Sequence, residues 1–371
     1  MWRVLCVDDD STIAQQAADF FTQWKGSPLG QFEASTEVNF GRASERLRSE
    51  RFDLVTLDLH AEADPPPEKG PGGDPAQQGQ GVLQELRQTR FVPVIFYTGY
   101  AEKIASLESL VVRVVKKGEN DLEQVRRAAT SLFGTGLPKL IRQIEEDQRS
   151  YVWDTVDKHS ANFVSEGGTE ELLYLLARRI AARLHRDSIR EALGHAGKTS
   201  RPIEQYIFPA LPGELGTGYI LGPDGDGTYW VVATPACDLA LRKAERVLLI
   251  AARGLTGDSR FAAWLKHRWT PNNGEPPAGA GAAYNKLVQL LKNNAEQRLR
   301  FLPGTFFIPD LLVDFQSLRH VTPEEANAMK VVCALDSPYG EELQIQLSKY
   351  YGRIGTPDLD VTAVLQRLIR L

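Results

Sequence analysis

The first ten residues constrain the fold more than any other part of the chain. An apolar segment, 3–7, runs directly into three consecutive carboxylates, Asp8, Asp9 and Asp10. An apolar strand that ends in adjacent acidic side chains concentrates negative charge at one tip of a sheet. That charge is tolerable only beside a divalent cation or a lysine. The pattern therefore predicts a buried strand with a charged chemical site at its carboxyl end.

Short apolar runs alternate with amphipathic segments throughout residues 1–133. The predicted strands are 3–7, 31–38, 54–57, 93–97 and 111–115, and the predicted helices are 13–24, 41–49, 81–88 and 121–133. Strands that are apolar throughout and separated by helices are typical of a parallel sheet that is buried on both faces. Ligands of such sheets bind at the carboxyl ends of the strands. We therefore expect the polar residues that follow each strand to converge.

The residues at these strand ends have types suited to one another. Asp8 and Asp9 follow the first strand, and Asp58 follows the third. Thr98 follows the fourth strand, and Lys116 follows the fifth. Carboxylates, a hydroxyl and an ammonium group at one sheet edge predict a site that handles a cation and an anionic group.

The motifs that carry these residues are VDDD at 7–10, DLVTLD at 53–58, PVIFYTG at 93–99 and VVKK at 114–117. In order and spacing they resemble the receiver domain of two-component response regulators. The resemblance covers roughly residues 1–133 and implies a flavodoxin-like fold, with a five-stranded parallel sheet in the order 2-1-3-4-5. It also implies a cytoplasmic phosphoprotein that serves signal transduction or a phosphorelay.

The resemblance implies a role for each residue. Asp58 would be the nucleophile that accepts a phosphoryl group from a histidine kinase. Lys116 would pair with Asp58 and then with the phosphoryl group, and the Thr98 hydroxyl would follow the new phosphate oxygens. The alternative is a pseudo-receiver that has lost this activity and only mediates assembly.

The same resemblance implies a magnesium site. Asp8, Asp9, Asp58 and the backbone carbonyl of His60 would supply its protein ligands, because Mg²⁺ prefers oxygen. Directly after this site, segment 61–80 is rich in Pro, Gly, Asp and Gln. We predict a solvated excursion there, either a tolerated insertion or a loop that selects a partner.

Composition bounds the rest of the chain. The 371 residues suffice for two folded units. A net charge of −5 argues against a protein that coats nucleic acid or binds along a membrane surface. Three scattered cysteines suggest neither a disulfide framework nor a zinc site and fit a reducing cytoplasm. No run of about 18 apolar residues occurs, so we expect no membrane span. The predicted organisation is a domain at 1–133, a linker helix at 134–165 and a second domain at 166–371.

Two helical patterns follow the first domain. Residues 137–163 have apolar side chains at roughly helical spacing, which predicts a helix that packs against a second copy of the chain or against the downstream domain. The alternative is an ordinary core helix of the second domain. Residues 170–193 combine a leucine-rich stripe with five arginines, which favours a second helix with a solvated basic face.

The C-terminal half is predicted to be an α+β domain with a small barrel or sheet. The expected strands are 219–221, 229–233 and 247–251, with further strands within 301–312. The expected helices are 323–329, 339–351 and 361–371. The segments 234–240, 311–321 and 335–359 loosely resemble domains of bacterial anti-phage and other conflict systems. That resemblance implies antiviral defence but supplies no catalytic residues.

The chemistry of this half stays open on sequence alone. Cys237 beside Asp238 is a candidate nucleophile without a base at a known spacing, so a structural cysteine is the competing interpretation. Segment 260–269 mixes tryptophans with cations, as nucleic-acid surfaces do, although aromatic packing explains it equally well. We find no helix-turn-helix, P-loop or diguanylate cyclase motif. The leading expectation is an output through protein contacts, and the alternative is an effector enzyme that acts on nucleic acid under control of the receiver.

Overall fold

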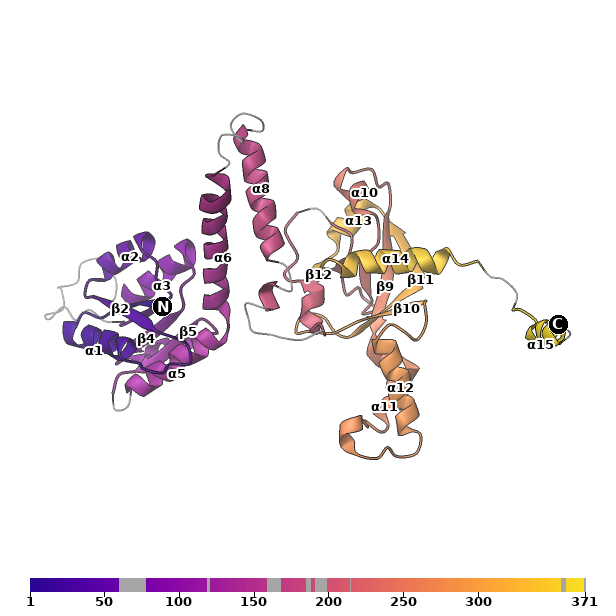
Figure 1. Cartoon of the computed structure of the whole chain (residues 1–371), viewed down its shortest axis with the longest axis horizontal. Helices are drawn as coiled ribbons and strands as arrows, with labels where there is room; N and C mark the ends of the chain where they lie inside the picture. The colour runs from indigo at the N-terminus through magenta and orange to yellow at the C-terminus, as the bar shows by residue number, and fades with distance from the viewer. Residues whose placement is uncertain are drawn as a thin grey trace. The chain divides into compact units, whose positions relative to one another are not determined.

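The computed structural model describes residues 1–59, 78–118, 121–158, 168–184, 188–190, 199–213, 215–354 and 358–369. The chain forms two compact units, Met1–Ala196 and Gly197–Leu371 (Figure 1). The predicted linker segment thus groups with the first unit, while the predicted domain boundaries at 133 and 165 stay predictions. His60 and positions 61–77 of the predicted excursion lie outside the described residues.

The first unit is built on a five-stranded parallel sheet. Its strand order, β2-β1-β3-β4-β5, confirms the predicted flavodoxin-like fold. The strands are β1 (Trp2–Val7), β2 (Phe32–Glu37), β3 (Leu54–Leu57), β4 (Val94–Thr98) and β5 (Val112–Lys116). Every residue of β3 and β4 is buried, as expected of central strands covered on both faces.

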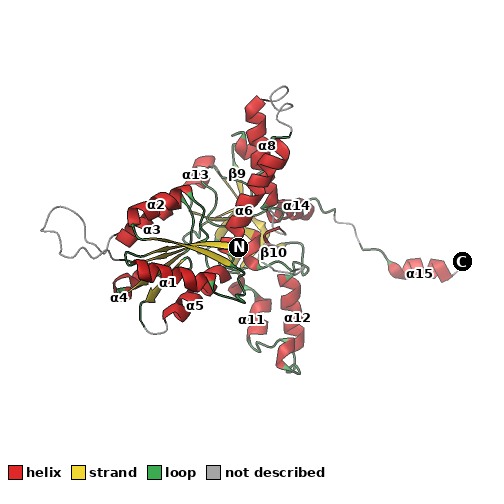
Figure 2. Cartoon of the chain, turned by 60° about the vertical axis from the view of Figure 1, so that its left-hand side comes forward, coloured by secondary structure: helices red, strands yellow, loops and turns green. Residues whose placement is uncertain are grey.

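Helices cover both faces of this sheet (Figure 2). On one face α2 and α3 bury Leu47 and Leu86 against β3, and on the other α1 and α5 bury Phe21 and Leu132 against β1. The helical segments are α1 (Ser11–Thr22), α2 (Phe40–Ser49), α3 (Gln78–Thr89), α4 (Ala101–Ile104), the 3₁₀ turn η2 (Ala105–Leu107) and α5 (Asp121–Gly134). This three-layer arrangement leaves the carboxyl ends of the strands free to form a site.

A helical hairpin completes the described part of the first unit. It consists of α6 (Leu137–Tyr151), which continues as the π-helical segment η3 (Val152–Val156), and α8 (Gly168–Arg183). Arg142 on α6 donates to the carbonyl oxygen of Met1 and lies over the ring of Trp2. Glu145 pairs with Arg51 at 3.0 Å. These contacts hold α6 against the amino end of the sheet.

The second unit contains a seven-stranded antiparallel sheet in the order β10-β11-β9-β8-β7-β12-β6. The α+β character predicted for this half is confirmed. The strands are β6 (Tyr206–Ile207), β7 (Tyr219–Leu221), β8 (Tyr229–Val232), β9 (Val247–Gly254), β10 (Leu299–Leu302), β11 (Leu311–Val321) and β12 (Val331–Leu335). Tyr206 on one edge strand donates through its hydroxyl to the carbonyl oxygen of Pro303, just beyond the other edge strand, so the two edges approach each other.

The strands predicted within 301–312 correspond to the end of β10 and the start of β11. The chain leaves the sheet after Leu302 and re-enters it at Leu311, and Asp310 accepts a hydrogen bond from the backbone of Gly304 to brace the loop between them. A Cβ at residue 304 would come within 2.7 Å of the Asp310 backbone nitrogen, so this loop requires glycine.

Helices and short turns surround this second sheet. They are η5 (Pro202–Gln205), α10 (Ala236–Ala240), η6 (Leu255–Gly257), α11 (Ser259–Leu265), η7 (Pro271–Asn273), α12 (Ala280–Leu291), α13 (Pro323–Ala328), α14 (Tyr339–Tyr351) and α15 (Val361–Ile369). Leu343 and Tyr350 of α14 pack into the largest core cluster of the unit, beneath Phe315. Across the described residues of both units, no helix has the length and apolarity that crossing a bilayer requires.

Candidate functional site

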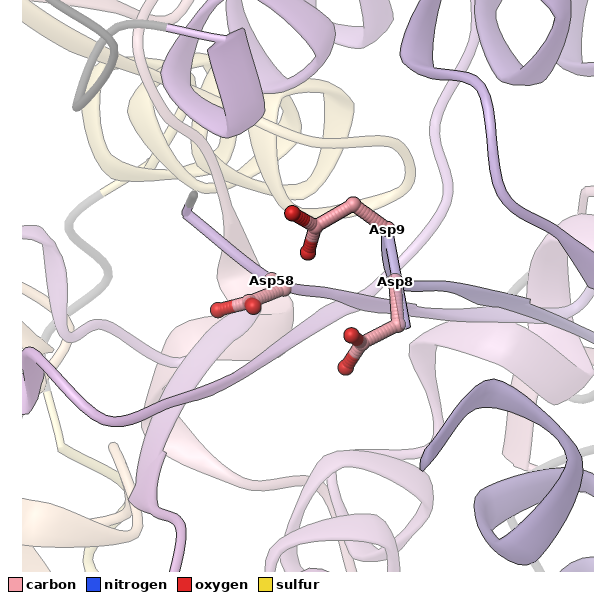
Figure 3. A group of neighbouring side chains, drawn as sticks. All are labelled: Asp8, Asp9 and Asp58. Atoms are coloured by element: carbon pink, nitrogen blue, oxygen red, sulfur yellow. The ribbon is translucent and has the colours of Figure 1, made fainter. Parts of the chain in front are cut away.

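Three carboxylates meet at the carboxyl edge of the parallel sheet. Asp8 and Asp9 follow β1, and Asp58 follows β3, which is the neighbour of β1 in the sheet. The backbone N–H of Asp58 donates to the carbonyl oxygen of Val7 at 2.9 Å and continues the pairing of the two strands to the site. Carboxylate oxygens of the three residues lie within 4.8 Å of one another (Figure 3). The structure thus brings together the three aspartates that the sequence places at these strand ends.

The third aspartate of the N-terminal triplet has a different task. Asp10 is the N-cap of α1, and its carboxylate accepts hydrogen bonds from the backbone N–H groups of Thr12 and Ile13. The bond from Thr12 is the main reason that the pKa of Asp10 lies below its usual value.

The lysine in the site is Lys117, whereas the sequence pattern had pointed to Lys116. The Lys117 ammonium lies 2.7 Å from a carboxylate oxygen of Asp8 and 2.8 Å from Oδ2 of Asp58. Lys116 instead pairs with Glu102 at 2.6 Å, and its side chain is 57% exposed against 19% for Lys117. The structure therefore does not bring Lys116 to the aspartates.

The end of β5 explains this difference. Lys116 is the last residue of the strand and pairs in register with Thr98, while Lys117 is the first residue beyond it. The N–H of Lys117 still donates to the carbonyl oxygen of Thr98 at 2.9 Å. Strand alternation puts residue 117 on the side of buried Val115, so its side chain is directed over the sheet tip and that of Lys116 is not. The sequence alone does not separate the two lysines, because Val114 and Val115 are both apolar and both faces of the sheet are covered.

A buried excess of negative charge dominates the electrostatics. Asp8 and Asp58 are both buried and share one ammonium group. Burial raises the pKa of Asp8 to about 6, although its bond with Lys117 acts in the opposite direction. Burial alone would lower the pKa of Lys117, but the hydrogen bonds to Asp58 and Asp8 outweigh it and raise that pKa.

Two further contacts hold the turn that carries Lys117. Asp121, at the start of α5, accepts hydrogen bonds from the N–H of Gly118 at 2.9 Å and from the hydroxyl of Tyr97 at 2.6 Å. The Lys117 ammonium lies 5.6 Å from the centre of the Tyr97 ring. Sequence reasoning did not assign Asp121 a role, because it looks like an ordinary acidic residue in the first turn of a helix.

Thr98 ends β4 and is fully buried. Its hydroxyl oxygen accepts a hydrogen bond from the N–H of Tyr100 at 3.3 Å. The hydroxyl therefore belongs to the turn between β4 and α4, which is the position the sequence predicts. His60, the remaining predicted ligand, lies outside the described residues.

The donor set of the site fits Mg²⁺. Asp8, Asp9 and Asp58 offer hard carboxylate oxygens, and two of these carboxylates are buried beside a single lysine. A divalent cation would compensate the negative charge that Lys117 leaves unbalanced.

The candidate nucleophile of the second unit lacks a catalytic environment among the described residues. Cys237 is exposed on the short helix α10, and its Sγ lies 3.8 Å from a carboxylate oxygen of Asp238. Neither His267 nor His320 is hydrogen bonded to Cys237 in the described structure, so no base assists it there.

The tryptophans of segment 260–269 pack within the hairpin of α11 and α12. Trp264 donates from its indole nitrogen to the carbonyl oxygen of Trp269 at 2.9 Å, and the Trp269 ring meets Tyr284 edge-on at 5.5 Å. Phe261 packs against Trp264 as well. These contacts favour the packing interpretation of this segment over a surface that stacks bases.

Comparison with known proteins gives matches in the N-terminal third of the chain. The response regulator TrrA of Thermotoga maritima, solved with Mg²⁺-BeF, is 26% identical over 36% of this chain and 100% of that protein, with a TM-score of 0.27. TrrA in complex with the histidine kinase ThkA matches at 25% identity over 36% of this chain and 99% of that one, also with a TM-score of 0.27. The receiver domain of the Francisella response regulator 1452 is 21% identical over 36% and 99% of the two chains, with a TM-score of 0.27.

No family model matches the chain. No curated protein matches it either.

Proposed function

We propose that residues 1–133 are a receiver domain and that the protein is a response regulator which accepts a phosphoryl group on Asp58. The observation that carries the proposal is the Asp58 carboxylate at the edge of a flavodoxin-like sheet, bonded to Lys117 and grouped with Asp8 and Asp9. A histidine kinase is the proposed donor, as the motif resemblance implies.

The chemistry requires little of the protein beyond charge and position. One carboxylate oxygen of Asp58 attacks the phosphorus of the donor, the phosphorus–nitrogen bond to the kinase histidine breaks, and the imidazole leaves with a proton. Oδ1 of Asp58 already accepts a hydrogen bond from the N–H of Leu59 at 2.7 Å, which fixes the orientation of the carboxylate. Lys117 stands where negative charge accumulates during transfer.

Mg²⁺ is the proposed cofactor, held by Asp8, Asp9 and Asp58, with the carbonyl of His60 as a predicted further ligand. When bound, the ion would neutralise charge on the phosphoryl oxygens. The protein's own role is to place the three carboxylates and to keep Lys117 between two of them. Thr98 is proposed to bond to the new phosphate oxygens once its hydroxyl leaves the turn to Tyr100.

The test is acetyl phosphate with Mg²⁺ on the full chain, followed by intact-mass measurement. We expect one added phosphoryl group that hydroxylamine removes, and none on Asp58→Asn. Asp19→Asn is the control, because Asp19 is exposed on α1 and its carboxylate is remote from the site. An unmodified wild type, or an equal adduct on Asp58→Asn, would overturn the proposal and favour a pseudo-receiver.

For the output we propose protein contacts made by the second unit, with a role in anti-phage signalling as the looser expectation. The surroundings of Cys237 and of Trp264 support this choice over an enzyme that acts on nucleic acid. Full-length protein that shifts nucleic acid in a mobility assay, and does so less after Lys266→Ala and Arg268→Ala, would contradict it.

A further inference from the structure

The helix α8 carries more apolar surface than its neighbour α6 covers. Leu172, Leu176 and Ile180, spaced four residues apart, are half-buried. A second stripe consists of Leu173, Ala177, Ala181 and Leu184, and all four are exposed. Leu173 is 64% exposed, and Tyr174 beside it is 68% exposed. A helix with apolar residues on two sides needs two packing partners, and the described first unit provides one.

The angle between the two stripes indicates how a second helix would pack on α8. With 3.6 residues per turn, the centre of the exposed stripe lies about 90° around the helix axis from the centre of the half-buried stripe. In a four-helix bundle each helix packs against two neighbours that are separated by about this angle. The hairpin of α6 and α8, whose helices lie side by side in Figure 1, has the form of half of such a bundle.

A shallow groove between the two helices supports the same arrangement. It has a volume of about 270 Å³ and is lined by side chains of both helices, among them Ile144, Tyr151, Ile180 and Leu184. Leu184 thus belongs both to the exposed stripe and to the wall of the groove. A side chain from a neighbouring helix could enter it, as knobs enter holes in bundles.

The charges along α8 indicate that the missing half is a second copy. Glu171 lies in its first turn, and Arg178, seven residues on and therefore on the same side of the helix, lies in its second half. Two copies of α8 packed antiparallel about a two-fold axis would bring Glu171 of each helix toward Arg178 of the other. A self-complementary surface of this kind is what an isologous dimer requires.

We propose that the protein forms a two-fold symmetric dimer in which the stripe Leu173, Ala177, Ala181 and Leu184 of two copies meets to complete a four-helix bundle. The anchoring of α6 through Arg142 and Glu145 would fix this bundle relative to the parallel sheet of each copy. The dimer depends on neither metal nor phosphoryl transfer, so its test is independent of the proposed function.

The test is the mass of the full chain by light scattering after size exclusion, in buffer that contains EDTA. We expect twice the 41.2 kDa of one chain for the wild type and a single chain for Leu173→Glu. Leu211→Glu is the matched control, because Leu211 is also 64% exposed but belongs to the second unit, and this variant stays a dimer. Circular dichroism and phosphorylation of Asp58 should be unchanged in both variants.

Cross-linking locates the contact. In a Cys237→Ser background, which leaves only the buried Cys6 and Cys333, Ala177→Cys should give dimers with a bifunctional maleimide. Ala262→Cys, exposed on α11, should not. A monomeric wild type would overturn the proposal. This includes a monomer in which the second unit of the same chain covers the stripe. A dimer that survives Leu173→Glu, or that Leu211→Glu breaks equally, would place the interface elsewhere and overturn it too.

Discussion

Two adjacent lysines at the end of β5 have opposite environments. Lys117 is half enclosed by the carboxylates of Asp8 and Asp58, and Lys116 reaches sideways to Glu102 in solvent. Composition cannot separate them, since both are lysines after the same apolar run. Because strand alternation separates them completely, the pair offers a matched experiment within two residues.

We predict that Lys117→Ala slows phosphorylation of Asp58 by about 100-fold, because a preorganised cation at the reacting oxygens is removed. Lys116→Ala should change the rate by less than about threefold, since it removes an exposed ion pair that contributes little. The measurement is the rate of adduct formation with acetyl phosphate at saturating Mg²⁺. Equal loss in both variants, or loss in Lys116→Ala alone, would contradict the assignment of Lys117.

At the level of elements, β10 and α14 of the second unit are tied by a buried guanidinium. Arg300 is 4% exposed and donates from both terminal nitrogens to the carboxylate of Glu342, at 2.8 and 2.7 Å. These bonds are the main reason that the pKa of Glu342 lies below its usual value. A buried cation that loses its partner is costly, so this contact stabilises the packing of the helix on the sheet.

Glu342→Ala should lower the free energy of unfolding of the second unit by about 2 kcal/mol, a value that allows for the half-exposed carboxylate. Arg298→Ala is the control, because Arg298 makes a similar two-pronged contact with Asp314 at the surface. Arg298→Ala should lower the free energy of unfolding by clearly less than Glu342→Ala does in the same urea titration. If both variants lose the same stability, burial of Arg300 is not what gives the contact its strength.

At the level of the whole molecule, the division at residues 196 and 197 predicts two unfolding transitions. Mg²⁺ should raise the midpoint of the transition that belongs to the first unit and leave the other unchanged, because its ligands all lie in that unit. Glu342→Ala should shift only the other transition. Differential scanning calorimetry with and without Mg²⁺ distinguishes the two. A single transition that Mg²⁺ shifts as a whole would contradict independent unfolding.

The effect of Mg²⁺ should also depend on pH. The pKa of Asp8 is raised from 3.8 to about 6, so the folded metal-free protein holds this proton more tightly than the unfolded chain does. Without metal, Asp8 therefore adds to the free energy of unfolding of the first unit at low pH. This contribution is lost as the pH rises from about 4 to 6. Mg²⁺ competes with the proton, so its stabilising effect should be larger at pH 7.5 than at pH 5. An equal shift at both values would exclude Asp8 as a ligand.

Local patterns in the sequence determined the parallel sheet and the grouping of Asp8, Asp9 and Asp58, whereas the strand order was implied by the resemblance of the motifs to receiver domains. The sheet and the grouping follow because buried runs of four to six residues make strands, and parallel strands bring their carboxyl ends to one edge. Tertiary structure alone decided the rest. The register of β5 against β4 selected Lys117, the hydrogen bonds of Asp121 with Gly118 and Tyr97 braced its turn, and Asp310 braced the loop that separates β10 from β11. Each depends on contacts between residues that are distant in sequence or on the direction of one side chain, and a local pattern contains neither.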